Sequence, residues 1–206
     1  CAEVVAKTIE HLAPNLLYSR EDIMEAILTG IISDTSRFMI LADMMNSFEY
    51  AYKFIKCGVN YNKIVENIYT NLTEERVRFL GHLLLNRLSL IKELHTAIIT
   101  ISKEDMQPFN IKNPNTDNIL AILMRIKNIY FSATILELDN GTKISLRSRG
   151  EIDAGKIARN DLNGGGHKHA ASGIIPLPFK QAIPFFYQIL NKYKTFLINP
   201  SSRIHE

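Results

Sequence analysis

The chain has 206 residues, of which 46% are hydrophobic and 22% are charged, and its formal net charge at pH 7 is +3. This composition excludes a disordered chain, and no uninterrupted apolar run approaches the ~18 residues that a membrane-spanning helix needs. Its two cysteines, Cys1 and Cys57, exclude a disulfide framework and a paired cysteine metal site. We therefore expect a cytoplasmic protein with one large domain or two small ones.

The first part of the chain predicts helices. A helix is expected at the very start from apolar residues at helical spacing: Val4, Val5, Ile9 and Leu12. Because this pattern is under way at Cys1, we expect the chain to be the later part of a longer protein. Ser19 is the expected N-cap of the next helix, which has acidic residues in its first turn. Further helices are expected over residues 47–57, 60–69 and 73–86.

After Leu88 the pattern predicts strands. The stretch "LHTAIITI" is apolar and β-branched, and "IYFSATILEL" followed by "TKISLRSR" predicts a β-hairpin. Asn140 and Gly141 are expected to form its turn, because both residues tolerate positive φ. Helices are expected over residues 116–126, 153–159 and 179–193. The fold class is therefore α/β, with a mostly helical first part.

Charge is unevenly distributed along the chain. Residues 1–88 carry 9 Lys and Arg against 11 Asp and Glu, whereas residues 89–206 carry 15 against 10. The second part is therefore the better suited to a polyanion, by a modest excess of charge.

Asp34, in "TGIISDTSRF", is a candidate metal ligand. If the helix that begins near Ser19 continues, Asp34 follows Ile27 and Ile31 on its apolar face. A carboxylate there requires compensation, and a metal ion is one form of it. The alternative, slightly favoured by spacing alone, is that Asp34 caps the following turn.

Two further stretches favour phosphate binding. In "ISLRSRG", a strand would direct Ser145, Arg147 and Arg149 to one face, and guanidinium groups match phosphate oxygens. In "LNGGGHKHAASG", the glycines predict a loop whose backbone N–H groups turn toward an anion, with His167 as a further donor. The alternatives are a solvated strand face and a glycine-rich hairpin with a surface histidine. His167 and His169 form a His-x-His pair that could bind a metal ion, but no third ligand lies nearby in sequence.

These stretches, in this order, resemble the DHH/DHHA1 phosphoesterase family. "GIISDTSRF" is similar to the last metal-binding motif of the DHH domain, and the arginine strand followed by Gly-Gly-Gly-His and "AASG" is similar to the DHHA1 signature. Within the family the chain looks most like the bifunctional nanoRNase and 3′-phosphoadenosine 5′-phosphate phosphatase branch. The resemblance implies the end of a DHH domain over residues 1–72, a connecting helix over 73–88, and a DHHA1 domain with a mixed sheet over 89–206.

The resemblance also implies roles for individual residues. Asp34 would be one ligand of a divalent metal pair, usually Mn²⁺. The implied substrate-binding residues are Arg147, Ser148, Arg149, Gly164, Gly165, Gly166 and His167. The Asp-His-His triplet of the family does not occur in this sequence, and one carboxylate does not assemble a two-metal site.

The implied function is a metal-dependent phosphoesterase that acts on short RNA or on a phosphorylated nucleotide. On this interpretation the chain supplies the phosphate-binding half and is inactive by itself. The alternatives are a non-catalytic nucleic-acid-binding DHHA1 module and a cyclic-dinucleotide phosphodiesterase. The sequence allows a homodimer.

Overall fold

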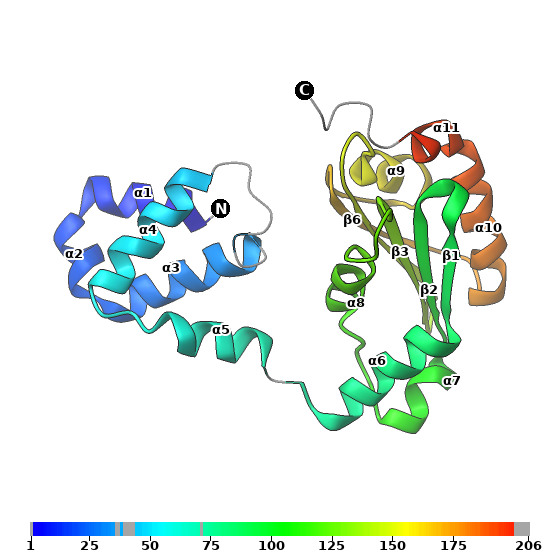
Figure 1. Cartoon of the computed structure of the whole chain (residues 1–206), viewed down its shortest axis with the longest axis horizontal. Coiled ribbons are helices and arrows are strands. Elements are labelled where there is room, and N and C mark those ends of the chain that lie inside the picture. Colours follow the sequence, from blue (N-terminus) through cyan, green and yellow to red (C-terminus); the bar gives the residue numbers. More distant parts are fainter. Residues whose placement is uncertain (1, 36–37, 39–43, 71, 200–206) are drawn as a thin grey trace. The chain divides into compact units, whose positions relative to one another are not determined.

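The computed structural model describes residues 2–35, 38, 44–70 and 72–199 (Figure 1). The chain divides into two compact units, Cys1–Leu72 and Thr73–Glu206. The first unit is helical, and the second is built on a six-stranded sheet. The predicted α/β class with a helical first part is therefore confirmed. Nowhere in the described ranges is there a helix with the length and apolar character needed to cross a membrane.

The described helices of the first unit are α1 (Ala2–Leu12), α2 (Pro14–Ser19), α3 (Glu21–Asp34), α4 (Met44–Lys56) and α5 (Tyr61–Tyr69). They pack around a core that includes Leu28, Ile31 and Phe54. Glu10 of α1 ties three helices together, because its carboxylate accepts hydrogen bonds from Tyr18, from Tyr50 (2.7 Å) and from Lys53 (2.9 Å). The hydrogen bond from Tyr18, followed by those from Lys53 and Tyr50, lowers the pKa of Glu10 to about 2.

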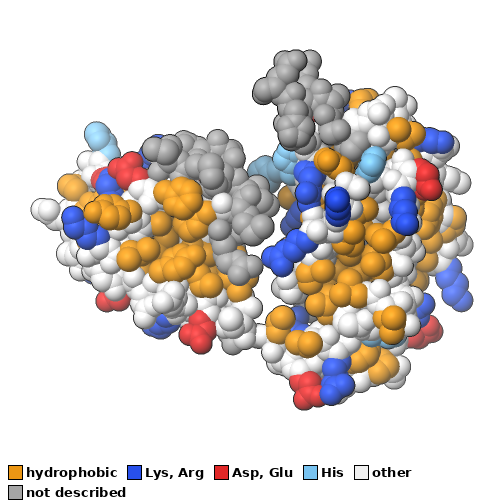
Figure 2. Space-filling view, viewed as in Figure 1, with side chains coloured by type: hydrophobic (Ala, Val, Ile, Leu, Met, Phe, Trp, Pro, Cys, Tyr) orange, Lys and Arg blue, Asp and Glu red, His pale blue; other side chains and the backbone are white. Residues whose placement is uncertain are grey.

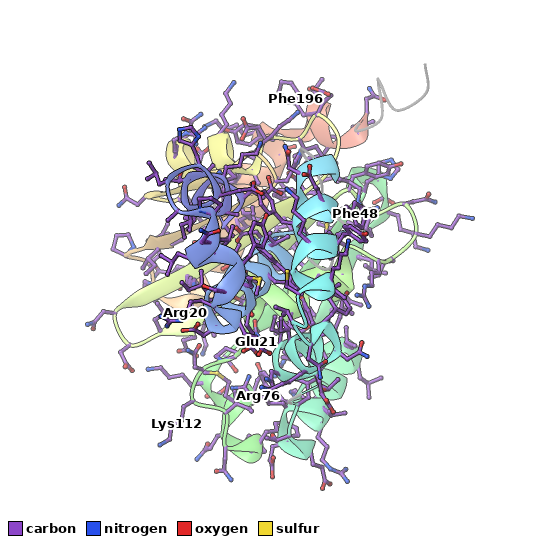
Figure 3. The ribbon with its side chains drawn as sticks, turned by 90° about the vertical axis from the view of Figure 1, so that its left-hand side faces the viewer. Arg20, Glu21, Phe48, Arg76, Lys112 and Phe196 are labelled. Carbon is purple, nitrogen blue, oxygen red and sulfur yellow. The ribbon has the colours of Figure 1, made fainter. Side chains whose placement is uncertain are left out.

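The start of α3 differs from the prediction. Ser19 is the last residue of α2, and Arg20 occupies the N-cap position of α3 without a side-chain cap. Arg20 instead pairs with Asp22 at 2.6 Å, beside Glu21 at the start of the helix (Figure 3). The physical reason is Pro14, whose fixed φ suits the first turn of a helix and begins the short α2 that contains Ser19.

The sheet of the second unit is mixed. Its strand order is β1-β2-β3-β4-β6-β5, with β2 and β3 parallel and every other neighbouring pair antiparallel. The strands are β1 (Leu88–Ile91), β2 (Thr96–Ile101), β3 (Phe131–Leu138), β4 (Gly141–Ser148), β5 (Gly164–His167) and β6 (Ala170–Ile175).

Helices cover both faces of this sheet, and α8 and α10 lie on opposite sides of it in Figure 1. One face packs against α9 (Ala154–Asp161), α10 (Phe179–Lys192) and α11 (Lys194–Ile198). The other packs against α6 (Glu74–Asn86), α7 (Lys103–Met106) and α8 (Thr116–Leu123), and the short 3₁₀ helices are η1 (Lys92–Leu94) and η2 (Gln107–Phe109). Each face therefore has its own apolar core.

Helix α6 belongs to the second unit, where the buried Asp105 holds it against α7. Asp105 Oδ1 lies 2.9 Å from His82 Nε2 and accepts a hydrogen bond from Arg87 Nε at 2.7 Å. Its Oδ2 accepts from the backbone N–H of Ser102 at 2.9 Å. Burial raises the pKa of Asp105, but the hydrogen bonds from His82, Ser102 and Arg87 together outweigh it and leave the pKa at about 2. Thr73 is the N-cap of α6, because its side chain accepts a hydrogen bond from the Arg76 N–H.

The β3–β4 hairpin is confirmed, but its turn is displaced by one residue. Leu138 pairs with Gly141, so the two residues of the turn are Asp139 and Asn140. Only Gly141, with a φ of 123°, has positive φ in this turn. Gly141 thus closes the turn as the first residue of β4, and Asn140 does not need the left-handed conformation that the prediction gave it.

Candidate phosphate-binding site

Arg147 stands on the side of β4 that faces α8. Ile144 and Leu146 are fully buried in the core on the α10 side, so the alternation of a strand directs Arg147 to the opposite side. There Nη2 donates to Asp117 Oδ1 of α8 at 2.8 Å, and Nη1 donates to the Leu146 carbonyl at 3.1 Å. The Arg147 side chain is only 27% exposed. These contacts use two of its five N–H groups.

The residues that follow Arg147 have different surroundings. Ser148 is buried, and its hydroxyl donates to the Ile152 carbonyl at 2.7 Å and lies 3.2 Å from His169 Nδ1. Ser148 therefore holds the end of β4 to the neighbouring loops, and its hydroxyl is engaged inside the protein. Arg149 follows the strand, is exposed, and lies with its guanidinium carbon 5.9 Å from the centre of the Tyr130 ring.

The glycine run forms the edge strand β5, so the predicted loop conformation is wrong. β5 pairs antiparallel with β6 from Gly164 opposite Gly173 to His167 opposite Ala170. The turn between the strands consists of Lys168 and His169. The glycine-rich hairpin, the alternative interpretation, is the observed conformation. The binding role of these glycines stays a prediction.

Two glycines of β5 are required by close packing inside the protein. A Cβ on Gly164 would lie 2.1 Å from the Ser172 carbonyl oxygen, and one on Gly166 would lie 2.4 Å from the Ala170 oxygen. Gly166 also has a φ of 141°, which side chains rarely adopt. On α9, a Cβ on Gly155 would lie 2.9 Å from the Gly166 oxygen. These glycines therefore let α9, β5 and β6 approach each other.

Gly165 differs from its two neighbours. Among the described residues, nothing lies within 4 Å of the position that its Cβ would take, and its φ is outside the positive range. Neither the backbone conformation nor packing against the described part of the chain requires glycine at this position. Open space above a strand is what a bound molecule needs for close approach to the backbone.

Strand register brings Arg147 and His167 to opposite sides of a small residue. Arg147 pairs with Ala170 of β6, and Ala170 pairs with His167 of β5. Directly paired residues point to the same face, so Arg147 and His167 stand about 10 Å apart, two strand spacings, with only a methyl group between them. In the next row Ser172 lies between Ser145 and Gly165. We call the surface of Arg147, His167, Ala170, Ser172 and Gly165 the open face.

The other end of these rows is closed by α8. Ser132 pairs with Arg147 and Thr134 pairs with Ser145, and both β3 residues are fully buried. Their hydroxyls have no hydrogen-bond partner in the part of the chain that the structure describes. The accessible residues of these paired rows therefore lie on β4, β6 and β5. Figure 2 shows Lys and Arg side chains gathered over the upper part of this unit.

Asp34 is the last residue of α3 and its side chain is exposed. The predicted placement on a buried stripe is therefore wrong, because Ile31 and Ile32 turn into the core while the helix directs Asp34 outward. The alternative, a cap for the following turn, falls partly on residues 36 and 37, outside the described residues. Among the described residues, no three His, Cys, Asp or Glu side chains gather where a metal ion could bind. These residues do not fit a two-metal centre by themselves.

Sequence reasoning missed Asp117. Asp117 is 30 residues from Arg147 in sequence, and a lone acidic residue in a first helical turn carries no signal of a distant partner. His169 is half-buried beside Ser148, and burial, followed by the charge of Lys168, lowers its pKa. Its ring therefore packs at the end of β4 and does not stand on the open face.

A family model described as the DHHA1 domain matches residues 89–195, more than half of the chain. The chain belongs to the DHHA1 domain family. The DHHA1 match runs from β1 into α11 and so contains all six strands of the sheet and the whole open face. The resemblance to the DHH/DHHA1 phosphoesterases is thereby confirmed.

Two curated proteins are similar in sequence to this DHHA1 protein. The bifunctional oligoribonuclease and PAP phosphatase NrnA of Bacillus subtilis is 26% identical over 151 residues, 73% of this chain and 47% of NrnA. The uncharacterized protein MG371 of Mycoplasma genitalium is 28% identical, over 82% of this chain and 51% of its own length. The chain thus spans about half the length of the curated relatives it matches.

A crystal structure of an exopolyphosphatase-related protein from Bacteroides fragilis is similar to the DHHA1 chain with a TM-score of 0.86 at 28% identity. The match covers 95% of this chain and 57% of that protein. The similarity therefore extends beyond the DHHA1 domain into the helical first unit.

Proposed function

We propose that the open face binds the phosphate of a short RNA or of a phosphorylated nucleotide. The observation that carries this proposal is the pair Arg147 and His167, directed to one face on either side of Ala170. A guanidinium and an imidazole at this spacing are both donors to phosphate oxygens. NrnA of Bacillus subtilis, a relative of this chain, is named an oligoribonuclease and PAP phosphatase, which supports a ligand of this class.

Each residue of the open face then has a distinct task. Arg147 supplies positive charge and N–H donors from β4, and His167 supplies a ring N–H from the edge strand β5. Ala170 has a small side chain that leaves space between them, so that the phosphate lies above its methyl group. Gly165 and Ser172 leave room for the sugar of the same nucleotide in the next row. Ser148 takes no part in the contact, because its hydroxyl is engaged inside the protein.

For the whole protein we propose phosphoester hydrolysis of such ligands with a divalent metal, Mn²⁺, and Asp34 as one of its ligands. A bound metal pair would supply an activated water and stabilise charge on phosphorus. The described residues do not fit such a centre alone, so no chemical step is assigned to them. We propose that the 206-residue chain binds phosphate-bearing ligands without turning them over.

Calorimetric titration of the chain with 3′-phosphoadenosine 5′-phosphate and with a 5′-phosphorylated RNA dinucleotide tests this proposal. Arg147→Ala and His167→Ala should each weaken binding by roughly 1.5–3 kcal/mol, the scale of a hydrogen bond to a charged group. Lys180→Ala is the matched control, because Lys180 is exposed on α10, on the opposite side of the sheet. It should leave the affinity unchanged.

Two results would contradict the proposal. Parental affinity in both Arg147→Ala and His167→Ala would show that the open face does not bind phosphate. Hydrolysis assays with Mn²⁺ test the second part separately. Turnover of either ligand by the purified 206-residue chain at the rate of a full-length DHH/DHHA1 phosphoesterase would show that the chain holds a complete catalytic centre.

A further inference from the structure

Asp117 lies at the edge of the open face, although nothing in the glycine or arginine motifs points to it. Its Oδ1 accepts the hydrogen bond of Arg147 Nη2 at 2.8 Å, while the Leu146 carbonyl accepts that of Nη1 at 3.1 Å. The two contacts hold both terminal nitrogens of the guanidinium, so they define the plane of the group. The other three N–H groups have no acceptor among the described residues and can donate to a ligand.

Asp117 is itself held in place by the helix on which it stands. Asn115 caps α8 through its side-chain oxygen, which accepts from the Asn118 N–H at 3.2 Å. On the buried side of the same turn, Ile119 and Leu120 pack into the core against the sheet. The carboxylate of Asp117 is therefore presented from a fixed turn. Arg147, by contrast, has a long side chain that loses about 2 kcal/mol of rotamer entropy when it is ordered.

We propose that Asp117 is a positioning residue, which orients the Arg147 guanidinium before a phosphate binds to it. The inference rests on the proposed function of the open face. A preorganised donor spends less of its binding energy on ordering itself. Asp117 does not compete with the phosphate, because it makes one contact with Nη2 and leaves the remaining N–H groups open. Its side chain is 72% exposed, so solvent screens its repulsion of the bound anion.

The test is a double-mutant cycle on the whole chain, with affinity for 3′-phosphoadenosine 5′-phosphate measured by calorimetry. Asp117→Ala should weaken binding about fivefold, the scale of an exposed ion pair. Asp117→Asn should bind within about twofold of the parent, because its amide oxygen still accepts from Nη2. In the Arg147→Ala background, Asp117→Ala should change nothing further, since Asp117 acts only through Arg147.

Asp139→Ala is the matched control. Asp139 is paired with Lys103 and is 90% exposed, and it lies in the β3–β4 turn, at the opposite end of β4 from Arg147. Its removal should leave affinity unchanged. Thermal unfolding of each variant separates a loss of fold from a loss of binding. If Asp117 had only a structural role, Asp117→Ala would lower the unfolding midpoint, and its loss of affinity would not depend on Arg147.

Three outcomes would overturn the inference. Tighter binding by Asp117→Ala would show that the carboxylate competes with phosphate. Unchanged binding would show that Arg147 needs no positioning, and an equal loss with and without Arg147 would show that Asp117 acts elsewhere. Parental affinity in Arg147→Ala alone is a different failure, because it removes the proposed function itself.

Discussion

The two faces of the β5–β6 hairpin are both built from small residues, but for different physical reasons. On the α9 side, neighbouring backbone atoms already occupy the space that side chains on Gly164 and Gly166 would need. On the other side, Gly165 has open space above it, and Ala170 lies between the two candidate phosphate donors. Alternate positions of one glycine strand therefore face different demands, close packing on the α9 side and the proposed ligand contact on the other.

The largest effect should come from the α9 side of the hairpin. Gly166→Ala introduces a Cβ 2.4 Å from the Ala170 oxygen at a φ of 141°, so we expect a loss of about 3 kcal/mol in the free energy of unfolding. Chemical denaturation measures it. Gly81→Ala, at an exposed position of α6 with nothing within 4 Å of the added Cβ, is the control and should stabilise by up to about 1 kcal/mol. Equal stability of Gly166→Ala and the parent would remove the packing explanation.

Acid should lower the free energy of unfolding through Asp105, which lies in the helix layer on the α8 side of the sheet. The folded pKa of Asp105, about 2, lies below its ordinary value of 3.8. The stabilisation is therefore fully present above pH 4 and is lost as pH falls toward 2. The shift corresponds to about 2 kcal/mol of unfolding free energy.

Denaturation curves of the parent and of Asp105→Asn between pH 5 and pH 2 isolate this contribution. Glu10 of the first unit titrates in the same range, and it contributes equally to both proteins. The parent should lose more stability than the variant over this range. Parallel pH profiles would show that Asp105 is not the group responsible.

Gly165 should separate binding from folding. Gly165→Val adds a β-branched side chain in open space on a strand, so the free energy of unfolding should change by less than about 0.5 kcal/mol. Affinity for 3′-phosphoadenosine 5′-phosphate should fall about tenfold, because the side chain occupies the space proposed for the nucleotide; tenfold corresponds to about 1.4 kcal/mol. Unchanged affinity would show that the ligand binds away from β5. Unfolding of the variant would show that Gly165, like Gly164 and Gly166, is required by packing.

The smallest effect is expected at Arg149. This residue is exposed beyond the end of β4, with its guanidinium over Tyr130. Arg149→Ala should weaken binding less than threefold, because solvent screens an exposed cation. Calorimetry of this variant beside Arg147→Ala measures the difference. A larger loss for Arg149→Ala would move the phosphate away from Ala170 toward the strand end.

Local patterns predicted the elements that depend on local chemistry. The helices predicted over residues 73–86 and 153–159 correspond to α6 and α9, and the alternation of β4 separated Ile144 and Leu146 from Arg147. The same periodic reasoning placed Asp34 on a buried stripe. It is the last residue of α3, and its side chain is exposed on the side of the helix away from the buried Ile31 and Ile32.

Features that depend on distant partners could not be predicted in this way. Glycine carries no strand propensity, so β5 is a strand only because β6 pairs with it and α9 packs close to it. The ion pair of Asp117 and Arg147 joins residues 30 positions apart. Such a contact follows from sheet register and helix placement, which short sequence windows do not contain.

The ion pair between Arg147 and Asp117 also has a consequence for ionic strength. The Asp117 carboxylate already neutralises Arg147, so few solvent anions gather at this guanidinium and few are displaced when a phosphate binds. Arg149 is exposed and has no carboxylate partner among the described residues, so mobile ions surround it instead. Added salt should therefore weaken a contact between Arg149 and a phosphate-bearing ligand more than the contact of Arg147 with its phosphate.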